Sequence, residues 1–300
     1  MHDSEPAIDV DLVRRLLRGQ FPRWADMPVH RLASGGTVNA VYRLGDELTV
    51  RLPLTAGGAD DIAWEARWLP FLAPALPVRV PTVVATGKPA EGYPWRWSVH
   101  EWLTGTTPVE GDVPDVLAHD LAALLDAMRD LDPAGGPPAY RGGLLAAVDA
   151  EMRAAMEALR HTDEPFDPAA IAASWAESLD APQWTDTPRW LHSDLMPSNL
   201  LLEGGRLTAV LDWSTAGVGD PACDLIPAWN LLPPGARDTF REATGADDAA
   251  WLRGRGWALS MAVIQLPYYR TTNPVISANA RHVISAVIGD GRDGPPTHTR

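Results

Sequence analysis

The chain is poor in the residues that build covalent or thiolate cross-links. Cys223 is the only cysteine among 300 residues, which excludes an intrachain disulfide and a thiolate metal cluster. Lysine is equally rare, since Lys88 in a G-K-P turn is the only one. A cationic role on a strand or helix therefore falls to arginine, which keeps its charge and can pair bidentately with a carboxylate or phosphate.

Long apolar runs are also missing. The longest candidate, residues 257–269, is interrupted by Gln265 and Pro267 and falls short of the roughly 20 residues that a bilayer requires. No basic and apolar segment of a secretory signal is visible near the N-terminus. We therefore expect a cytoplasmic protein without a membrane partner.

Basic residues are too few to balance the acidic ones. The formal net charge is −14, which argues against a nucleic acid partner because a polyanion would be repelled. The excess is uneven: residues 1–103 carry −1 and residues 104–300 carry −13. An acidic second part favours a cationic small molecule as its ligand. The alternative is that these surface acids only maintain solubility.

Several motifs of nucleotide enzymes and hydrolases are absent. The sole G-K is followed by Pro89, so no G-x-x-x-x-G-K-[ST] phosphate loop exists. G-x-S-x-G and H-E-x-x-H are missing too, which disfavours a serine hydrolase of the α/β type and a zinc peptidase. Another phosphate-handling arrangement is needed if the chain is a nucleotide enzyme.

Residues 190–225 carry the densest group of candidate functional side chains. The segment W-L-H-S-D-L-M-P-S-N supplies His192, Asp194 and Asn199, and a G-G turn and a second strand lead on to Asp212. This pattern predicts a loop followed by a β-hairpin that returns Asp212 towards Asn199 and Asp194. A carboxylate can orient and deprotonate a hydroxyl, while an amide oxygen and a second carboxylate suit Mg²⁺. The bland alternative is a core histidine flanked by turn residues.

The order His-x-Asp-x-x-x-x-Asn followed by Asp is that of protein kinases. H-S-D-L-M-P-S-N, V-L-D-W-S and G-V-G-D-P-A-C-D-L resemble the aminoglycoside phosphotransferase family of kinase-like enzymes. The resemblance implies a bilobal α+β fold. Its first lobe, residues 1–103, would hold an N-terminal helix, a five-stranded antiparallel sheet and one further helix. Its second, mainly helical lobe, residues 104–300, would carry the catalytic loop and a flexible tail from about residue 289.

The resemblance also implies a nucleotide site in the first lobe. A Gly-bearing loop between two strands lets backbone N–H groups approach phosphates, although such a turn alone more often makes only a hairpin. Arg51 stands where kinases carry the phosphate-contacting lysine, Glu65 is its expected partner, and the segment H-E-W-L resembles the hinge that meets the base. The expected nucleotide-binding residues are Ser34, Gly35, Gly36, Thr37, Arg51, Glu65, Glu101, Trp102 and Leu103.

The second lobe offers weaker candidates for the acceptor. Asp220 and Pro221 are typical of a helix start, which suggests a structural role, and Asp224 faces the acceptor or only complements the helix dipole. Tyr268 and Tyr269 lie in the segment P-Y-Y-R. These tyrosines either line an acceptor pocket or pack as ordinary aromatic residues.

Together these features predict a phosphotransferase that moves the γ-phosphoryl group of ATP or GTP to a hydroxyl of a cationic small molecule, such as an aminoglycoside or another antibiotic. Asp194 would be the base, Asn199 and Asp212 would hold Mg²⁺, and His192 would brace the loop. A metabolic kinase acting on a choline-like, sugar or homoserine-like acceptor is the alternative within the fold. A catalytically silent nucleotide-binding module is the alternative outside the enzymes. Ser193 and Met196 stand where many family members carry Gly and His.

Overall fold

The computed structural model describes residues 8–32 and 38–290 and falls into two compact units. The first unit extends to Thr104 and also includes Ala209–Ser214, and the second holds Gly105–Thr208 and the described chain from Thr215 onward. The predicted boundary at residues 103 and 104 did not anticipate that residues 209–214 would belong to the first unit. Asp212 is therefore part of the first unit, although it comes directly after the second strand of the predicted hairpin.

The first unit is built on a five-stranded antiparallel sheet, as predicted. Its strands follow the order β1-β2-β3-β5-β4, and β2 pairs with β3 over six residues from Asn39↔Pro53 to Leu44↔Leu48. The bounds are β1 (Val29–Arg31), β2 (Asn39–Leu44), β3 (Leu48–Pro53), β4 (Val83–Gly87) and β5 (Trp97–Glu101).

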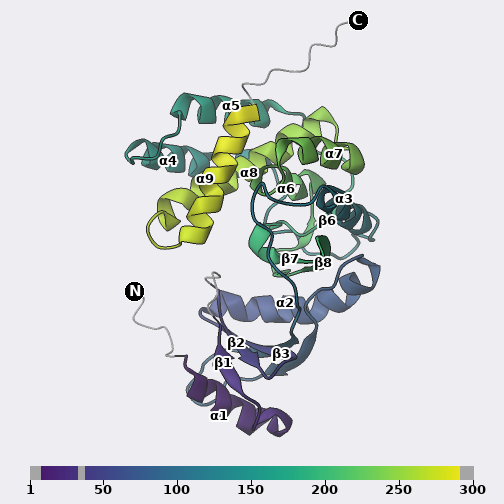
Figure 1. Ribbon diagram of the computed structural model, residues 1–300, viewed down its shortest axis with the longest axis vertical. Helices are drawn as coiled ribbons and strands as arrows, with labels where there is room; N and C mark the ends of the chain where they lie inside the picture. The colour runs from purple at the N-terminus through teal and green to yellow at the C-terminus, as the bar shows by residue number, and fades with distance from the viewer. Residues whose placement is uncertain (1–7, 33–37, 291–300) are drawn as a thin grey trace, which may run out of the picture. The chain divides into compact units, whose positions relative to one another are not determined.

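Two helices belong to this sheet (Figure 1). The first, α1 (Val10–Gln20), turns Leu12, Val13, Leu16 and Leu17 into a core shared with β2, β3 and Trp97. The second, α2 (Ala56–Leu72), contacts β3, β4 and β5 and begins after a Thr55 cap. Glu65 on α2 is buried, although a charged helix residue ordinarily faces solvent. This burial places Glu65 against the sheet, where Arg51 lies.

The second unit is mainly helical. Its helices are α3 (Val116–Arg129), α4 (Asp149–Arg160), α5 (Pro168–Asp180), α6 (Pro227–Asn230), α7 (Pro234–Thr244), α8 (Asp248–Tyr269) and α9 (Pro274–Asp290), with short 3-10 turns η1 (Pro22–Trp24) and η2 (Ala73–Ala75) in the first unit and η3 (Leu145–Val148), η4 (Pro197–Asn199) and η5 (Pro221–Leu225) in the second. α8 and α9 pack against each other (Figure 1). The tail predicted to be flexible begins within α9, and its residues from 291 lie outside the described part.

Two small antiparallel sheets hold the catalytic loop. β6 (Arg189–Leu191) pairs with β9 (Gly217–Gly219), and β7 (Leu200–Glu203) pairs with β8 (Arg206–Val210). The β7–β8 pair is the predicted hairpin, with Gly204 and Gly205 at positive φ in its turn. Within the described residues, no helix combines the length and apolar character needed to cross a membrane.

Candidate active site

The catalytic loop, His192–Asn199, begins where β6 ends and runs through η4 into β7. Trp190 and Leu191 of β6 are buried, and the pairing Leu191↔Gly217 fixes the point at which the chain leaves the sheet. Ser193 then adopts a positive φ of 64°, which is uncommon for a residue with a side chain. The turn therefore needs strong support from its surroundings.

Asp224 supplies much of that support. Its carboxylate accepts hydrogen bonds from two consecutive backbone N–H groups, those of His192 at 2.6 Å and Ser193 at 2.8 Å. Asp224 is only 2% exposed, and its side chain is occupied in anchoring the loop; a contact with the acceptor stays a prediction. Burial raises the pKa of Asp224 to about 7, against the lowering effect of the two backbone hydrogen bonds.

Thr215 ties the loop down from the other side. Its Oγ1 donates to the carbonyl of His192 at 2.9 Å, and its own carbonyl accepts from Ser193 Oγ at 2.7 Å. Ser193 is fully buried. The side chain that replaces the family's common glycine thus makes a buried hydrogen bond within the loop.

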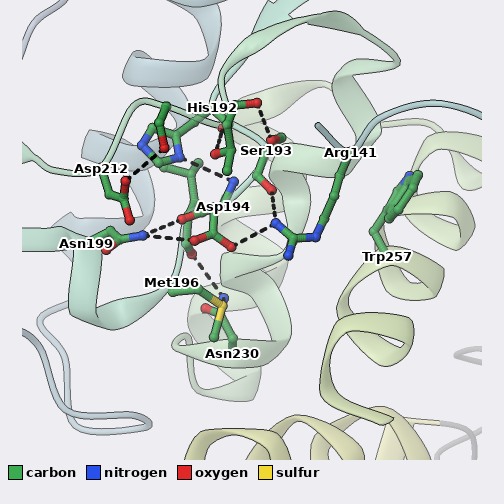
Figure 2. Close-up of polar contacts among 12 residues, drawn as sticks. Arg141, His192, Ser193, Asp194, Met196, Asn199, Asp212, Asn230 and Trp257 are labelled. Carbon is green, nitrogen blue, oxygen red and sulfur yellow. Dashed lines mark hydrogen bonds and ion pairs between the residues drawn. The ribbon is translucent and has the colours of Figure 1, made fainter. Parts of the chain in front are cut away.

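Asp194 lies at the centre of the polar contacts in this loop (Figure 2). Asn199 Nδ2 donates to its Oδ2 at 3.2 Å and to its backbone carbonyl at 2.9 Å. The backbone N–H of Asp194 donates to Nδ1 of the fully buried His192 at 3.3 Å. The structure thus brings together the three predicted catalytic residues, and the 20% exposure of the Asp194 side chain leaves it accessible to a small molecule.

Sequence reasoning missed Arg141, which also reaches Asp194. Its Nη1 lies 3.1 Å from Asp194 Oδ1 and 3.3 Å from the Ser193 carbonyl (Figure 2). Arg141 belongs to the segment P-P-A-Y-R-G-G, whose prolines and glycines indicate only a loop. No spacing in the sequence links it to Asp194, 53 residues further on.

In the first unit, the predicted pair of Arg51 and Glu65 is confirmed as a contact. Arg51 Nη1 lies 3.3 Å from Glu65 Oε1. Burial raises the pKa of Glu65 to about 7, opposed by the charge of Arg51 and reinforced by the charges of Asp212 and Asp61. Asp212 therefore lies close enough to Glu65 to act on it electrostatically. The role of Arg51 towards a nucleotide stays a prediction.

His100 and Asp61 are further members of this cluster that the sequence did not indicate. His100 Nε2 lies 3.7 Å from Glu65 Oε2, and burial lowers the pKa of His100 well below its ordinary value. Burial and the charge of Asp212 raise the pKa of Asp61. Three carboxylates and one guanidinium thus share this part of the first unit, so an incoming cation would relieve their mutual repulsion.

In the predicted hinge, residues 101–103, two backbone N–H groups already have hydrogen-bond partners within the first unit. The Glu101 N–H donates to the Thr82 carbonyl at 3.0 Å, and the Trp102 N–H donates to the Glu47 carbonyl at 2.7 Å. A nucleotide base would therefore have to meet the Leu103 N–H or the carbonyl groups of this segment. The predicted phosphate loop, Ser34, Gly35, Gly36 and Thr37, lies outside the described residues.

Tyr268 and Tyr269 end α8 and pack edge to face, with ring centroids 4.7 Å apart. Tyr268 is 75% exposed, and Tyr269 is half-buried. The two rings contact each other, and the Tyr269 carbonyl accepts hydrogen bonds from the N–H groups of Thr272 and Asn273 in the turn that follows. A role at the acceptor stays a prediction for both.

The donor chemistry of the predicted metal ligands suits Mg²⁺. Asn199 uses Nδ2 towards Asp194, which turns the hard oxygen Oδ1 elsewhere, and Asp212 is an exposed carboxylate to which Ser214 Oγ donates at 3.2 Å. No cluster of three or more His, Cys, Asp or Glu side chains suited to a metal occurs in the described part of the chain. Mg²⁺ itself needs only one or two protein ligands beside waters and substrate phosphates, so its binding by Asn199 and Asp212 stays a prediction.

Curated proteins give one short match. The uncharacterized protein YcbJ of Bacillus subtilis is 35% identical over 80 residues, which cover 26% of this chain and 24% of that protein. The match therefore spans about a quarter of the length of the relative and carries no activity across.

Solved structures match the whole fold. The GDP and kanamycin complex of APH(2")-IIia is 20% identical, covers 93% of this chain and 98% of its own, and has a TM-score of 0.70. The macrolide 2'-phosphotransferase MphH of Brachybacterium faecium is 21% identical, with 97% and 99% covered and a TM-score of 0.61. At these identities the likeness establishes the kinase-like fold, as predicted.

Family membership rests on a longer sequence match. The sequence model of the phosphotransferase enzyme family aligns with residues 29–257, which include the sheet of the first unit, the catalytic loop and the hairpin. The predicted resemblance is thereby confirmed, and phosphoryl transfer to a hydroxyl is the reaction class of the family. The chain belongs to the phosphotransferase enzyme family.

Proposed function

We propose that the protein transfers the γ-phosphoryl group of ATP or GTP to a hydroxyl of a small, cationic acceptor such as an aminoglycoside or another antibiotic. The carrying observation is the triad of His192, Asp194 and Asn199 on a loop whose backbone is anchored by the buried Asp224. Such an arrangement suits a reaction in which catalysis is mostly positioning and electrostatics.

In the proposed reaction, Asp194 orients the acceptor hydroxyl and accepts its proton. The acceptor oxygen forms a bond to the γ-phosphorus while the bond from that phosphorus to the bridging oxygen breaks, and the nucleoside diphosphate leaves. Asn199 and Asp212 would hold Mg²⁺, which would neutralise phosphate charge. Arg51, positioned by Glu65, pairs with the phosphates.

The choice of acceptor rests on charge. Residues 104–300 carry −13, and an acidic surface concentrates cations near it. Structures with the same fold include complexes with kanamycin, gentamicin and streptomycin, and other relatives are macrolide phosphotransferases. These neighbours are bound to GDP, ADP or ATP in several cases, which supports a purine nucleotide as the co-substrate.

An acceptor screen tests the proposal. Release of ADP or GDP is measured with kanamycin, gentamicin, streptomycin and a macrolide, beside choline, homoserine and simple sugars. We expect turnover of at least one antibiotic, lost in EDTA and restored by Mg²⁺. Turnover of only the metabolic acceptors would replace the antibiotic by the metabolic alternative, and nucleotide binding without Mg²⁺-dependent turnover of any acceptor would favour a silent module.

Variants then test the assigned residues. Asp194→Asn is expected to lower kcat by about 100-fold to 10,000-fold, the usual contribution of a general base. Asp212→Asn is expected to raise the Mg²⁺ concentration needed for half-maximal rate. Asp180→Ala, at an exposed aspartate that ends α5, is the matched control and should leave the kinetics unchanged. Full activity of Asp194→Asn would overturn the assignment.

A further inference from the structure

The segment that carries Arg141 is hydrogen-bonded to β9 and its neighbouring residues, and β9 pairs with the strand β6 that leads into the catalytic loop. The segment around it runs beside β9: the Ala139 N–H donates to the Val218 carbonyl at 3.1 Å, and the Asp220 N–H donates to the Gly142 carbonyl at 2.8 Å. The Tyr140 N–H donates to the Thr215 carbonyl at 3.0 Å. Backbone hydrogen bonds therefore fix the chain on both sides of Arg141.

Gly142 allows this close approach. Its φ is +100°, and a Cβ placed there would lie 2.9 Å from Leu191 Cδ1. A side chain would therefore be strained and would push against the strand that leads into the catalytic loop. The glycine next to Arg141 thus keeps the segment in contact with β6, and the position of the guanidinium is coupled to that of the loop.

The guanidinium completes the support of the Asp194 carboxylate. Arg141 Nη1 contacts Oδ1 at 3.1 Å, and Asn199 Nδ2 contacts Oδ2 at 3.2 Å, so each oxygen has a donor from a different element. The ordinary interpretation of an arginine–aspartate contact is a surface ion pair of little consequence. Here both side chains are only 20% exposed, and the same Nη1 also binds the Ser193 carbonyl.

Tyr140 extends this arrangement towards solvent. The centre of the Arg141 guanidinium lies 4.9 Å from the centroid of the Tyr140 ring, within the range of a cation–π contact. The tyrosine is nevertheless 75% exposed, which is high for a large aromatic side chain. An open aromatic surface thus lies beside the arginine that contacts Asp194.

We infer that Arg141 is a positioning residue for Asp194 and that Tyr140 contacts the acceptor next to the reacting hydroxyl. This inference rests on the proposed function of Asp194. Because Arg141 offsets the charge of Asp194, the part of the acceptor that carries the reacting hydroxyl is uncharged and presents an apolar face to Tyr140. Positive groups of the acceptor then lie further away, near other acids of the second unit.

The positioning of Asp194 by Arg141 is tested with water as the acceptor of the phosphoryl group. Basal hydrolysis of ATP and GTP is measured for wild type, Asp194→Asn, Arg141→Ala and Arg141→Lys, with and without added guanidinium chloride at millimolar concentration. We expect Arg141→Ala to lower kcat about 10-fold to 100-fold through misplacement of the base, with the nucleotide KM unchanged. Lysine and added guanidinium should each restore part of the loss, while Arg153→Ala, which removes an exposed partner of Asp149, should change nothing.

The possible outcomes distinguish a failure of the inference about Arg141 from a failure of the proposed function. Loss of activity in Asp194→Asn together with an unaffected Arg141→Ala would overturn the inference and leave the proposed function intact. Loss in Arg141→Ala that neither lysine nor guanidinium restores would show a merely structural role and would also overturn it. A wild type without Mg²⁺-dependent hydrolysis or transfer would remove the proposed function and the inference with it.

The Tyr140 half is tested with the antibiotic turned over fastest among kanamycin, gentamicin, streptomycin and the macrolide. Tyr140→Ala should raise the KM of that acceptor about fivefold or more, since loss of an aromatic contact costs about 1 kcal/mol, and by a larger factor than it changes the rate of basal hydrolysis. Tyr140→Phe, which keeps the ring, should behave as wild type. An unchanged acceptor KM in Tyr140→Ala would overturn this half.

Discussion

Arg51 and Glu65 form an ion pair across the first unit, with 3.3 Å between Nη1 and Oε1. Arg51 lies on β3 and Glu65 on α2, so the contact ties the helix to the sheet. The chain has a single lysine, Lys88, in a turn, and the resemblance to kinases predicts that Arg51 takes the role of their phosphate-contacting lysine. Its guanidinium can pair with the carboxylate and still present donors to a phosphate.

Replacement of Arg51 should weaken nucleotide binding. We expect Arg51→Ala to raise the KM of the nucleotide about tenfold or more, because a charge-assisted hydrogen bond contributes about 1.5–3 kcal/mol. The acceptor KM should change little. Arg51→Lys should lose less than Arg51→Ala, since it keeps the charge. Arg15→Ala, which removes an exposed partner of Glu91, is the control, and equal effects on both KM values would contradict a phosphate-specific role.

Glu65 should make stability depend on pH. Its pKa is raised from 4.5 to about 7 by burial, so between these values the folded protein keeps a proton that the unfolded chain has lost. The free energy of unfolding should therefore fall as pH rises through this window, by at most about 3 kcal/mol for a shift of this size. Urea unfolding from pH 4.5 to 8 should show a flatter profile for Glu65→Gln. Identical profiles for the two proteins would exclude this contribution.

Local patterns in the sequence predicted much of this molecule. The family resemblance predicted an N-terminal helix, found as α1, and the G-G turn after β7 predicted the hairpin. The contact of Arg51 with Glu65 was predicted because the kinase arrangement places these two positions together. In each case the information lay within a few residues or within a known motif.

Contacts between distant segments were not predictable in this way. Arg141 and Asp194 are 53 residues apart, and neither periodicity nor a motif relates them. For Asp224 the sequence left open a contact with the acceptor or a contribution to the helix dipole, and it indicated neither the burial of this side chain nor its hydrogen bonds to the loop. Its burial follows from the N–H groups of a loop 31 and 32 residues earlier. Composition could not reveal that these groups needed an acceptor.

Asp224 should be essential to the stability of the loop. Asp224→Ala leaves the His192 and Ser193 N–H groups without their acceptor, and we expect a loss of about 2–4 kcal/mol in the free energy of unfolding. Asp224→Asn should lose less, since its amide oxygen can still accept from one N–H group. Both variants should also lower kcat, because the backbone before Asp194 is released. Urea unfolding and steady-state kinetics, with Asp180→Ala as the control, would contradict this if both quantities stayed at wild-type values.

Ser193 should tolerate glycine better than alanine. Its φ of 64° costs a residue with a side chain about 1 kcal/mol, and its hydroxyl bond to the Thr215 carbonyl returns a similar amount. Ser193→Gly loses both and should lie within about 0.5 kcal/mol of wild type, whereas Ser193→Ala keeps the strain and should lose about 1 kcal/mol. The Thr215 carbonyl still accepts from the Tyr140 N–H in both variants. Thermal unfolding that ranks alanine above glycine would contradict this balance.

Arg253 and Asp220 form a buried ion pair, and we expect its loss to lower the stability of the second unit without lowering kcat. Arg253 Nε lies 2.6 Å from Asp220 Oδ2, and both side chains are less than 10% exposed. Asp220 also accepts from the Ala222 N–H at the start of η5, the turn that contains Asp224. Arg253→Met leaves a buried carboxylate without its cation and should cost about 3–5 kcal/mol.

The double variant Arg253→Met with Asp220→Asn removes the charge while keeping an oxygen to cap η5, and it should therefore recover part of the loss. Arg153→Met, at an exposed pair with Asp149, should cost less than about 1 kcal/mol. Urea unfolding of the three proteins measures these differences, and kcat per folded molecule should stay near wild type because neither residue contacts Asp194. A cost for Arg253→Met equal to that of Arg153→Met would mean that the buried pair contributes no more than a surface pair.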